Sequence, residues 1–209
     1  AAQLVLRAVN AAADRIDATV DELGRLDAVA GDGDHGIGMQ RGSSAARKAA
    51  AAAVADGAGI GTTLTDAADA WADKAGGTSG ALWGLILRSM GTAFGDELVP
   101  DAAAVAGGVA AARDAVVGFG KAQVGDKTMV DTLVPFADAL LREAAQGAAL
   151  VAAWQSAAAV ASQAAQATAE LLPRIGRARP HAEKSLGTPD PGAISMASII
   201  EAVGGVLAE

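Results

Sequence analysis

Asp27, Asp32 and Asp34 place three carboxylates in one short segment, around the glycine-rich run Gly31–Gly36 (GDGDHG). Carboxylates this close repel one another, so they either point into water or surround a cation. The flanking glycines permit tight turns that could converge the oxygens. Oxygen ligands in a chain without cysteine favour Mg²⁺, Mn²⁺ or Ca²⁺ over zinc. Because Asp-Gly is also ordinary turn chemistry, the segment alone leaves a solvated acidic turn and a metal site equally open.

Three familiar patterns are nearly matched in this segment, and each fails on a physical point. The spelling G-x-G-x-x-G is present, but no buried strand precedes it and its aspartates would oppose a bare pyrophosphate. A calcium-binding hand needs a bidentate Glu at the twelfth position from Asp32, where this chain has Ser43. An aspartyl-phosphate phosphatase needs a nucleophilic Asp at the end of a strand, whereas this segment lies between helices. That phosphatase remains the weaker enzyme alternative.

Two further loops have types of residue that bind anions. Gly76–Gly80 (GGTSG) leads into an apolar helix, so helix amides with the hydroxyls of Thr78 and Ser79 could bind an anion, or either hydroxyl could simply cap the helix. Gly118–Thr128 resembles a phosphate-binding P-loop at first sight. Asp126 separates the final glycine from Lys127, so the geometry of a phosphate cradle is not expected.

Helices must position these loops, because apolar residues recur at helical spacing and strand-length alternation of Val, Ile and Thr is missing. Asp190 and Pro191 form a typical helix start, with a side-chain cap followed by proline at the first helical position. The longest irregular stretch, between Pro173 and Pro189, is expected to be functional or mobile. The predicted helices cover residues 4–23, 38–54, 63–74, 80–94, 101–117, 128–145 with a bend at Pro135, 150–172, and a last helix from Pro191.

Composition narrows the classes of protein that remain. The 209 residues carry 16 Lys and Arg against 24 Asp and Glu, a net charge of −8, which disfavours a nucleic-acid binder. The absence of cysteine excludes disulfides and a thiolate nucleophile. Gln155 and Glu201 break the longest apolar runs below the length of a membrane span. We therefore expect one cytoplasmic domain over residues 1–209, with no membrane and no nucleic-acid partner.

Taken in order, the loops resemble one family: the nucleotide-binding L subunit, or equivalent C-terminal domain, of dihydroxyacetone kinases. The resemblance implies an all-α barrel of eight antiparallel helices with the nucleotide site at one end, in agreement with the helix count above. The matching segments are residues 26–27 with 31–36, 76–82, 120–131, 176–178 and 185–193.

The resemblance also implies site residues. Asp27, Asp32 and Asp34 would hold two Mg²⁺ ions that bridge the phosphates of ADP or ATP. No catalytic side chain is assigned with certainty to this domain. For His35 a phosphate or structural contact is favoured over catalysis, and His181 is a lesser candidate. The residues expected to contact the nucleotide are His35, Gly36, Ile37, Gly38, Thr78 and Ser79 along the phosphates, Gly120 and Met129 at the adenine, and Arg177, Asp190, Pro191 and Gly192 closing the pocket.

The acceptor, in such proteins, is a ketose bound on a partner K subunit or a fused K domain. The chain is therefore expected to be a kinase component, either a separate subunit, with a homodimer as one form, or the C-terminal part of a longer fused chain. The phosphoryl donor is ATP or a phosphotransferase-system subunit that recharges bound ADP; His35 resembles the second branch and Gly38 departs from it. Alternatives are a regulatory module that binds a transcription regulator and a kinase for erythrulose or a carrier-bound fatty acid. We expect residues Gly176 to Ser185 to become ordered when the partner docks.

Overall fold

Helices make up most of the chain in the computed structural model, which describes residues 1–176 and 179–209. Within these residues there is no strand, so the predicted all-helical class is confirmed. The described helices are α1 (Ala2–Ala28), α2 (His35–Ala55), α3 (Ile60–Ala75), α4 (Gly77–Phe94), α5 (Ala102–Gly120), α6 (Val130–Ala145), α7 (Leu150–Ala167) and α8 (Pro191–Leu207), with the short 3₁₀ helices η1 (Thr168–Glu170) and η2 (Arg179–Ser185).

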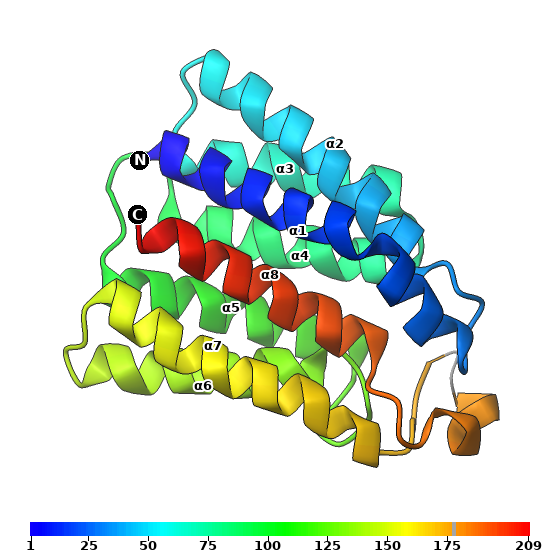
Figure 1. The fold of residues 1–209 in the computed structure, drawn as a ribbon. Helices are drawn as coiled ribbons and strands as arrows, with labels where there is room; N and C mark the ends of the chain where they lie inside the picture. The colour runs from blue at the N-terminus through cyan, green and yellow to red at the C-terminus, as the bar shows by residue number, and fades with distance from the viewer. Residues whose placement is uncertain (177–178) are drawn as a thin grey trace.

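The helices form a closed ring. Each α-helix packs against the next one in the chain, and α8 packs against α1 to complete the circuit. Figure 1 shows neighbouring helices running in opposite directions, with both chain termini at one end. The α1–α2 connection, η2 and the start of α8 lie at the other end. This arrangement agrees with the barrel that the sequence resemblance implied, and it gathers loops that are distant in sequence at one end.

Several helix boundaries differ from the predicted ones. The prediction that the first helix ends near Gly24 was wrong, since α1 continues to Ala28 and its last turn holds Asp27. A glycine lowers helix propensity by only about 1 kcal/mol, which the burial of Leu23 at the same turn offsets. Helix α4 begins at Gly77, so Thr78 lies inside its first turn and no side chain caps it. The cap by Asp190 is confirmed, because its carboxylate accepts a hydrogen bond from the Ala193 amide at 2.8 Å.

The barrel interior is built from small aliphatic residues around two aromatic pairs. Trp71 of α3 stacks on Trp83 of α4 with ring centroids 5.0 Å apart, and Phe136 of α6 meets Trp154 of α7 edge to face, also at 5.0 Å. Such pairs add about 0.5–1.5 kcal/mol each beyond their area burial. An apolar cavity of about 220 Å³ remains beside them and reaches Leu4 near the terminal end. The aromatic pairs thus tie neighbouring helices together along the ring.

Helix α5 has the length and apolar composition of a membrane span, by those two criteria alone. One third of its most apolar window is buried inside the barrel. Arg113 and Asp114 interrupt the apolar run, and the Arg113 guanidinium bonds Asp138 of α6 at 2.5 Å. Its place between α4 and α6 is that of a wall helix in the ring.

Candidate functional site

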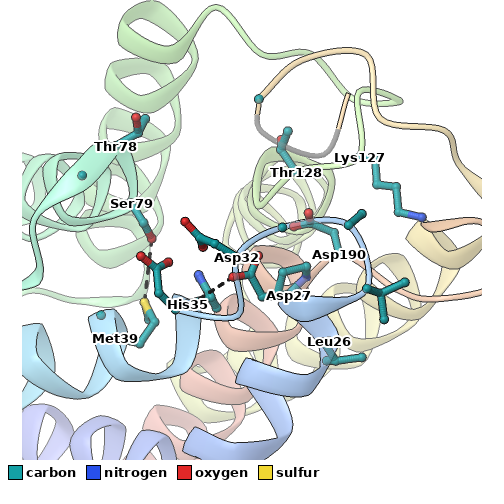
Figure 2. Close-up of a pocket in the computed structure, with 18 of the residues that line it drawn as sticks. Leu26, Asp27, Asp32, His35, Met39, Thr78, Ser79, Lys127, Thr128 and Asp190 are labelled. Atoms are coloured by element: carbon teal, nitrogen blue, oxygen red, sulfur yellow. Dashed lines mark hydrogen bonds between the residues drawn. The ribbon is translucent and has the colours of Figure 1, made fainter. Parts of the chain in front are cut away.

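A pocket of about 390 Å³ opens at the end of the barrel that carries the α1–α2 connection. Four parts of the chain surround it (Figure 2). These parts are the end of α1 with the start of α2, the α3–α4 junction, the turn before α6, and the connection from η1 to α8. The lining residues used below are Asp27, Asp32, Asp34, His35, Gly38, Met39, Thr78, Ser79, Lys127, Thr128, Ile175, Gly176, Ser185, Thr188, Asp190 and Pro191.

The three aspartates converge on one side of this pocket. One carboxylate oxygen from each of Asp27, Asp32 and Asp34 lies within 4.8 Å of the other two. The approach depends on Gly31, because a Cβ at this position would overlap Oδ1 of Asp27. The His35 amide donates to Oδ2 of Asp27 at 3.3 Å, so the start of α2 also orients the cluster. An all-oxygen set at this spacing suits a hard divalent cation.

His35 connects the acidic cluster to α8. Its Nε2 lies 3.0 Å from Oγ of Ser195, which in turn is 3.1 Å from the Gly192 carbonyl oxygen. Burial lowers the pKa of His35, while the negative charge of Asp27 and a hydrogen bond to the Pro191 backbone act in the opposite direction. The imidazole therefore makes a structural contact between the starts of α2 and α8. Sequence reasoning missed Ser195, whose only local signal is its position one turn beyond the Asp190–Pro191 helix start.

The α3–α4 junction forms another part of the pocket wall. Thr78 and Ser79 lie in the first turn of α4, where backbone N–H groups and the helix dipole favour an anion. The Ser79 hydroxyl lies 3.9 Å from the sulfur of Met39, and the hydroxyl of Thr78 is exposed (Figure 2). The pocket is therefore lined both by groups that bind cations and by groups that bind anions.

A buried charged cluster closes the third side. Asp131 shapes the turn before α6, accepting hydrogen bonds from the amides of Gly125 at 2.5 Å and Thr128 at 2.7 Å. Lys127 is only 5% exposed, and burial lowers the pKa of its ammonium group. Loss of solvent raises the pKa of Asp190 to about 7, against the bonds from the Ala193 and Gly192 amides and the attraction of Lys127. The sequence pattern assigned no role to Lys127 or to Asp131, although both lie in the matching segment 120–131.

The remaining predicted residues fall into three groups. Gly36 is buried against α1, where a Cβ would overlap the Val20 carbonyl oxygen, and Ile37 points out with 48% of its surface exposed. Other predicted contacts lie at the pocket end but outside its lining, with Met129 only 6% exposed. Arg177 lies outside the described residues. The predicted contacts that do not line this pocket are Gly36, Ile37, Gly120, Met129 and Gly192.

The fold and this loop order define a family. The family described as "DAK2 domain" matches residues 29–205, most of the chain. The chain therefore belongs to the DAK2 domain family, which confirms the family resemblance drawn from its loops. The ADP-binding subunit DhaL of a PEP-dependent dihydroxyacetone kinase from Listeria innocua is 32% identical over 198 residues, which are 95% of this chain and 93% of that protein.

A more similar relative is considerably longer. The L-erythrulose kinase of Pectobacterium atrosepticum is 59% identical over 207 residues, which are 99% of this chain and 35% of that protein. The chain thus spans about one third of the length of this relative. Crystal structures of the dihydroxyacetone kinase of C. freundii, native and in complex with AMP-PNP and Mg²⁺, superpose with TM-scores of 0.73 and 0.70 at 24% identity. They cover 97% of this chain and 34% of that one, and they support the barrel fold.

Proposed function

We propose that this chain is the nucleotide-binding, phosphoryl-transferring part of a short-ketose kinase. The observation that carries the proposal is the convergence of Asp27, Asp32 and Asp34 to within 4.8 Å, in a pocket that the first turn of α4 also lines. The C. freundii relative of this fold was crystallised with AMP-PNP and Mg²⁺, which supports the same type of ligand here. Two Mg²⁺ ions, held by the three carboxylates, would neutralise charge between them and the phosphates of the nucleotide.

The chain's own residues bind and orient the nucleotide. Thr78, Ser79 and the first amides of α4 contact the phosphates in this proposal, together with His35 and Gly38 of α2, which line the same pocket. Gly120 and Met129, which lie at the pocket end outside its lining, would border the adenine, and the turn from Asp190 to Gly192 would close the pocket. Phosphoryl transfer depends mainly on positioning and charge neutralisation, so the domain requires no side-chain base.

The acceptor in this proposal is a ketose presented by a K domain or subunit. The relative named L-erythrulose kinase favours erythrulose, with dihydroxyacetone as the second acceptor. A docking surface is available, because large apolar side chains are exposed at the pocket end of the barrel, on the start of α2, the end of α5 and the connections beside the pocket. These side chains are Ile37, Phe119, Val124, Leu172 and Leu186.

The donor in this proposal is exchangeable ATP. The chain is 59% identical to the longer kinase and 32% identical to the separate ADP-binding subunit, which favours the fused branch of the family. Its use of ATP fits a cytoplasmic protein. Mass spectrometry of the purified protein tests this assignment: we expect no nucleotide after dialysis, and ADP that survives dialysis would contradict it.

Calorimetric titration with ADP and ATP tests the metal site. In magnesium, Asp32→Asn and Asp34→Asn are expected to weaken binding at least about 100-fold, because each removes a charge from the cation site. Removing magnesium with a chelator should weaken nucleotide binding to the wild type as much as these substitutions do. Asp56→Asn, at the exposed far end of α2, is the matched control and should bind normally. Unchanged affinity in both site variants, with helicity intact, would eliminate the proposal.

A further inference from the structure

Lys127 is a buried cation beside the pocket that the proposed nucleotide contacts do not use. Its ammonium group donates hydrogen bonds to the carbonyl oxygen of Leu171 at 3.0 Å and to that of Ser185 at 2.7 Å. These acceptors lie 44 and 58 positions away, at the two ends of the connection that leads from η1 through η2. The lysine backbone has a φ of 62°, a left-handed conformation that non-glycine residues seldom adopt.

Two backbone hydrogen bonds also attach the ends of this connection to neighbouring elements. The Arg174 amide donates to the Asp126 carbonyl oxygen at 3.2 Å, which attaches the first end to the turn before α6. The Gly187 amide donates to the Ala169 carbonyl oxygen at 2.8 Å, which joins the second end to η1. Lys127 is the only described side chain bonded to both ends by its own charged group, among the residues 1–176 and 179–209.

The direction of the side chain argues against a phosphate contact. Figure 2 shows Lys127 extending away from Asp27 and Asp32, and two of its three N–H groups are already given to carbonyl oxygens. Hydrogen bonds from a charged donor are stronger than neutral ones, so their loss would leave both ends held more weakly, by the backbone bonds of Arg174 and Gly187. The connection supplies Ile175, Gly176 and Thr188 to the pocket wall. Its attachment therefore fixes part of the pocket.

We infer that Lys127 is a positioning residue that holds both ends of the η1–α8 connection against the pocket. It acts on the nucleotide through that wall and contacts no phosphate. The inference rests on the proposed function only for its effect on nucleotide release. The attachment itself is a property of the protein without ligand.

Hydrogen exchange of the nucleotide-free protein tests the attachment. Lys127→Met should speed exchange of the Arg174 and Gly187 amides by about tenfold or more, since two charge-assisted bonds are lost. Lys184→Met removes an exposed lysine from the same connection and should leave both amides unchanged. Lys127→Arg retains a charged donor and should restore most of the protection. Unchanged exchange in Lys127→Met would overturn the inference.

The amides of α3 and α6 are the internal reference. Faster exchange of these reference amides as well would mean that Lys127→Met destabilises the whole protein, and the Lys127→Arg variant then decides. If its barrel is intact, faster exchange confined to Arg174 and Gly187 would show that the geometry of the lysine is needed. Full protection of both amides in Lys127→Arg would show that a charged donor is sufficient. Global exposure in both variants would overturn a local role.

Release of a labelled ADP analogue tests the functional consequence. Lys127→Met should raise the dissociation rate about tenfold while the association rate changes little. A loss of affinity for ADP but not for adenosine, with amide exchange unchanged, would identify a phosphate contact and overturn the inference. If the wild-type protein binds no nucleotide, the proposed function fails, while the exchange experiment still decides the attachment.

Discussion

Asp190→Asn is predicted to make the ligand-free protein more stable at neutral pH and much less so in acid. Loss of solvent raises the pKa of Asp190 from 3.8 to about 7 in the folded protein. The unfolded chain loses this proton near pH 4, so between pH 4 and 7 the folded state binds one more proton. Stability therefore falls as pH rises through that range. The carboxamide of the variant carries no charge and can still accept the Ala193 amide bond.

The magnitude follows from the size of the pKa shift. About three pKa units correspond to about 4 kcal/mol between the fully protonated and fully ionised carboxyl. The fraction of this effect that falls between pH 5 and pH 8 is about 2 to 3 kcal/mol. The difference in unfolding free energy between Asp190→Asn and wild type should grow by that amount over this interval. Titrating groups that do not interact with Asp190, such as His35, are present in both proteins and largely cancel.

Urea unfolding followed by far-ultraviolet circular dichroism, at pH 5, 6, 7 and 8 with chelator present, measures this difference. Asp101→Asn is the control for replacing a capping carboxylate, because Asp101 caps α5 at an exposed position by accepting the Ala104 amide bond at 2.8 Å. A difference between Asp190→Asn and wild type that stays constant from pH 5 to pH 8 would refute the reasoning, since it would show that the Asp190 carboxyl is not withheld from water.

Two further predictions concern how the helices that carry the site are held. Gly36→Ala should lower the free energy of unfolding by about 1–3 kcal/mol and weaken magnesium-dependent nucleotide binding, because the new methyl group would overlap the Val20 carbonyl oxygen. The control is Gly107→Ala, whose methyl group would meet open space and should not destabilise the protein. Equal stability of the two variants in urea would contradict this account. Hydrogen bonds from the Thr62 hydroxyl and amide lower the pKa of Asp96, so its contribution to stability is fully present above pH 3.8 and is lost as pH falls through the lowered pKa of the folded protein. Asp96→Asn should therefore lower the thermal midpoint more at pH 7 than at pH 3, and an equal loss at both would count against the bond.

Helical periodicity and helix-capping patterns in the sequence were sufficient to predict much of the fold and the types of residue at the site. The start of α8 was predicted because a capping Asp followed by Pro is determined by the first helical turn itself. The convergence of the aspartates was anticipated as one of two possibilities from charge repulsion and Gly31. The position of Asp27 within α1 was not predicted, because the helix continues through Gly24 for reasons of tertiary packing.

Contacts between distant parts of the chain lay beyond sequence reasoning. His35 and Ser195 are 160 positions apart and meet only because α8 closes the ring against α1. Lys127 was dismissed as part of a failed P-loop, and its real acceptors are backbone carbonyl groups, which every residue possesses and no sequence pattern singles out. The roles of individual residues depend on such pairs, whereas the helical pattern depends on neighbours.

The aromatic pairs of the barrel have a spectroscopic consequence. The chain has no tyrosine, and Trp71, Trp83 and Trp154 are each at most 5% exposed in the barrel interior. Intrinsic emission therefore reports the integrity of the helical wall and is insensitive to groups at the pocket mouth. The stacked indoles of Trp71 and Trp83 should give an exciton couplet that vanishes when α3 and α4 separate, so ligand occupancy must be followed through the ligand's own signal.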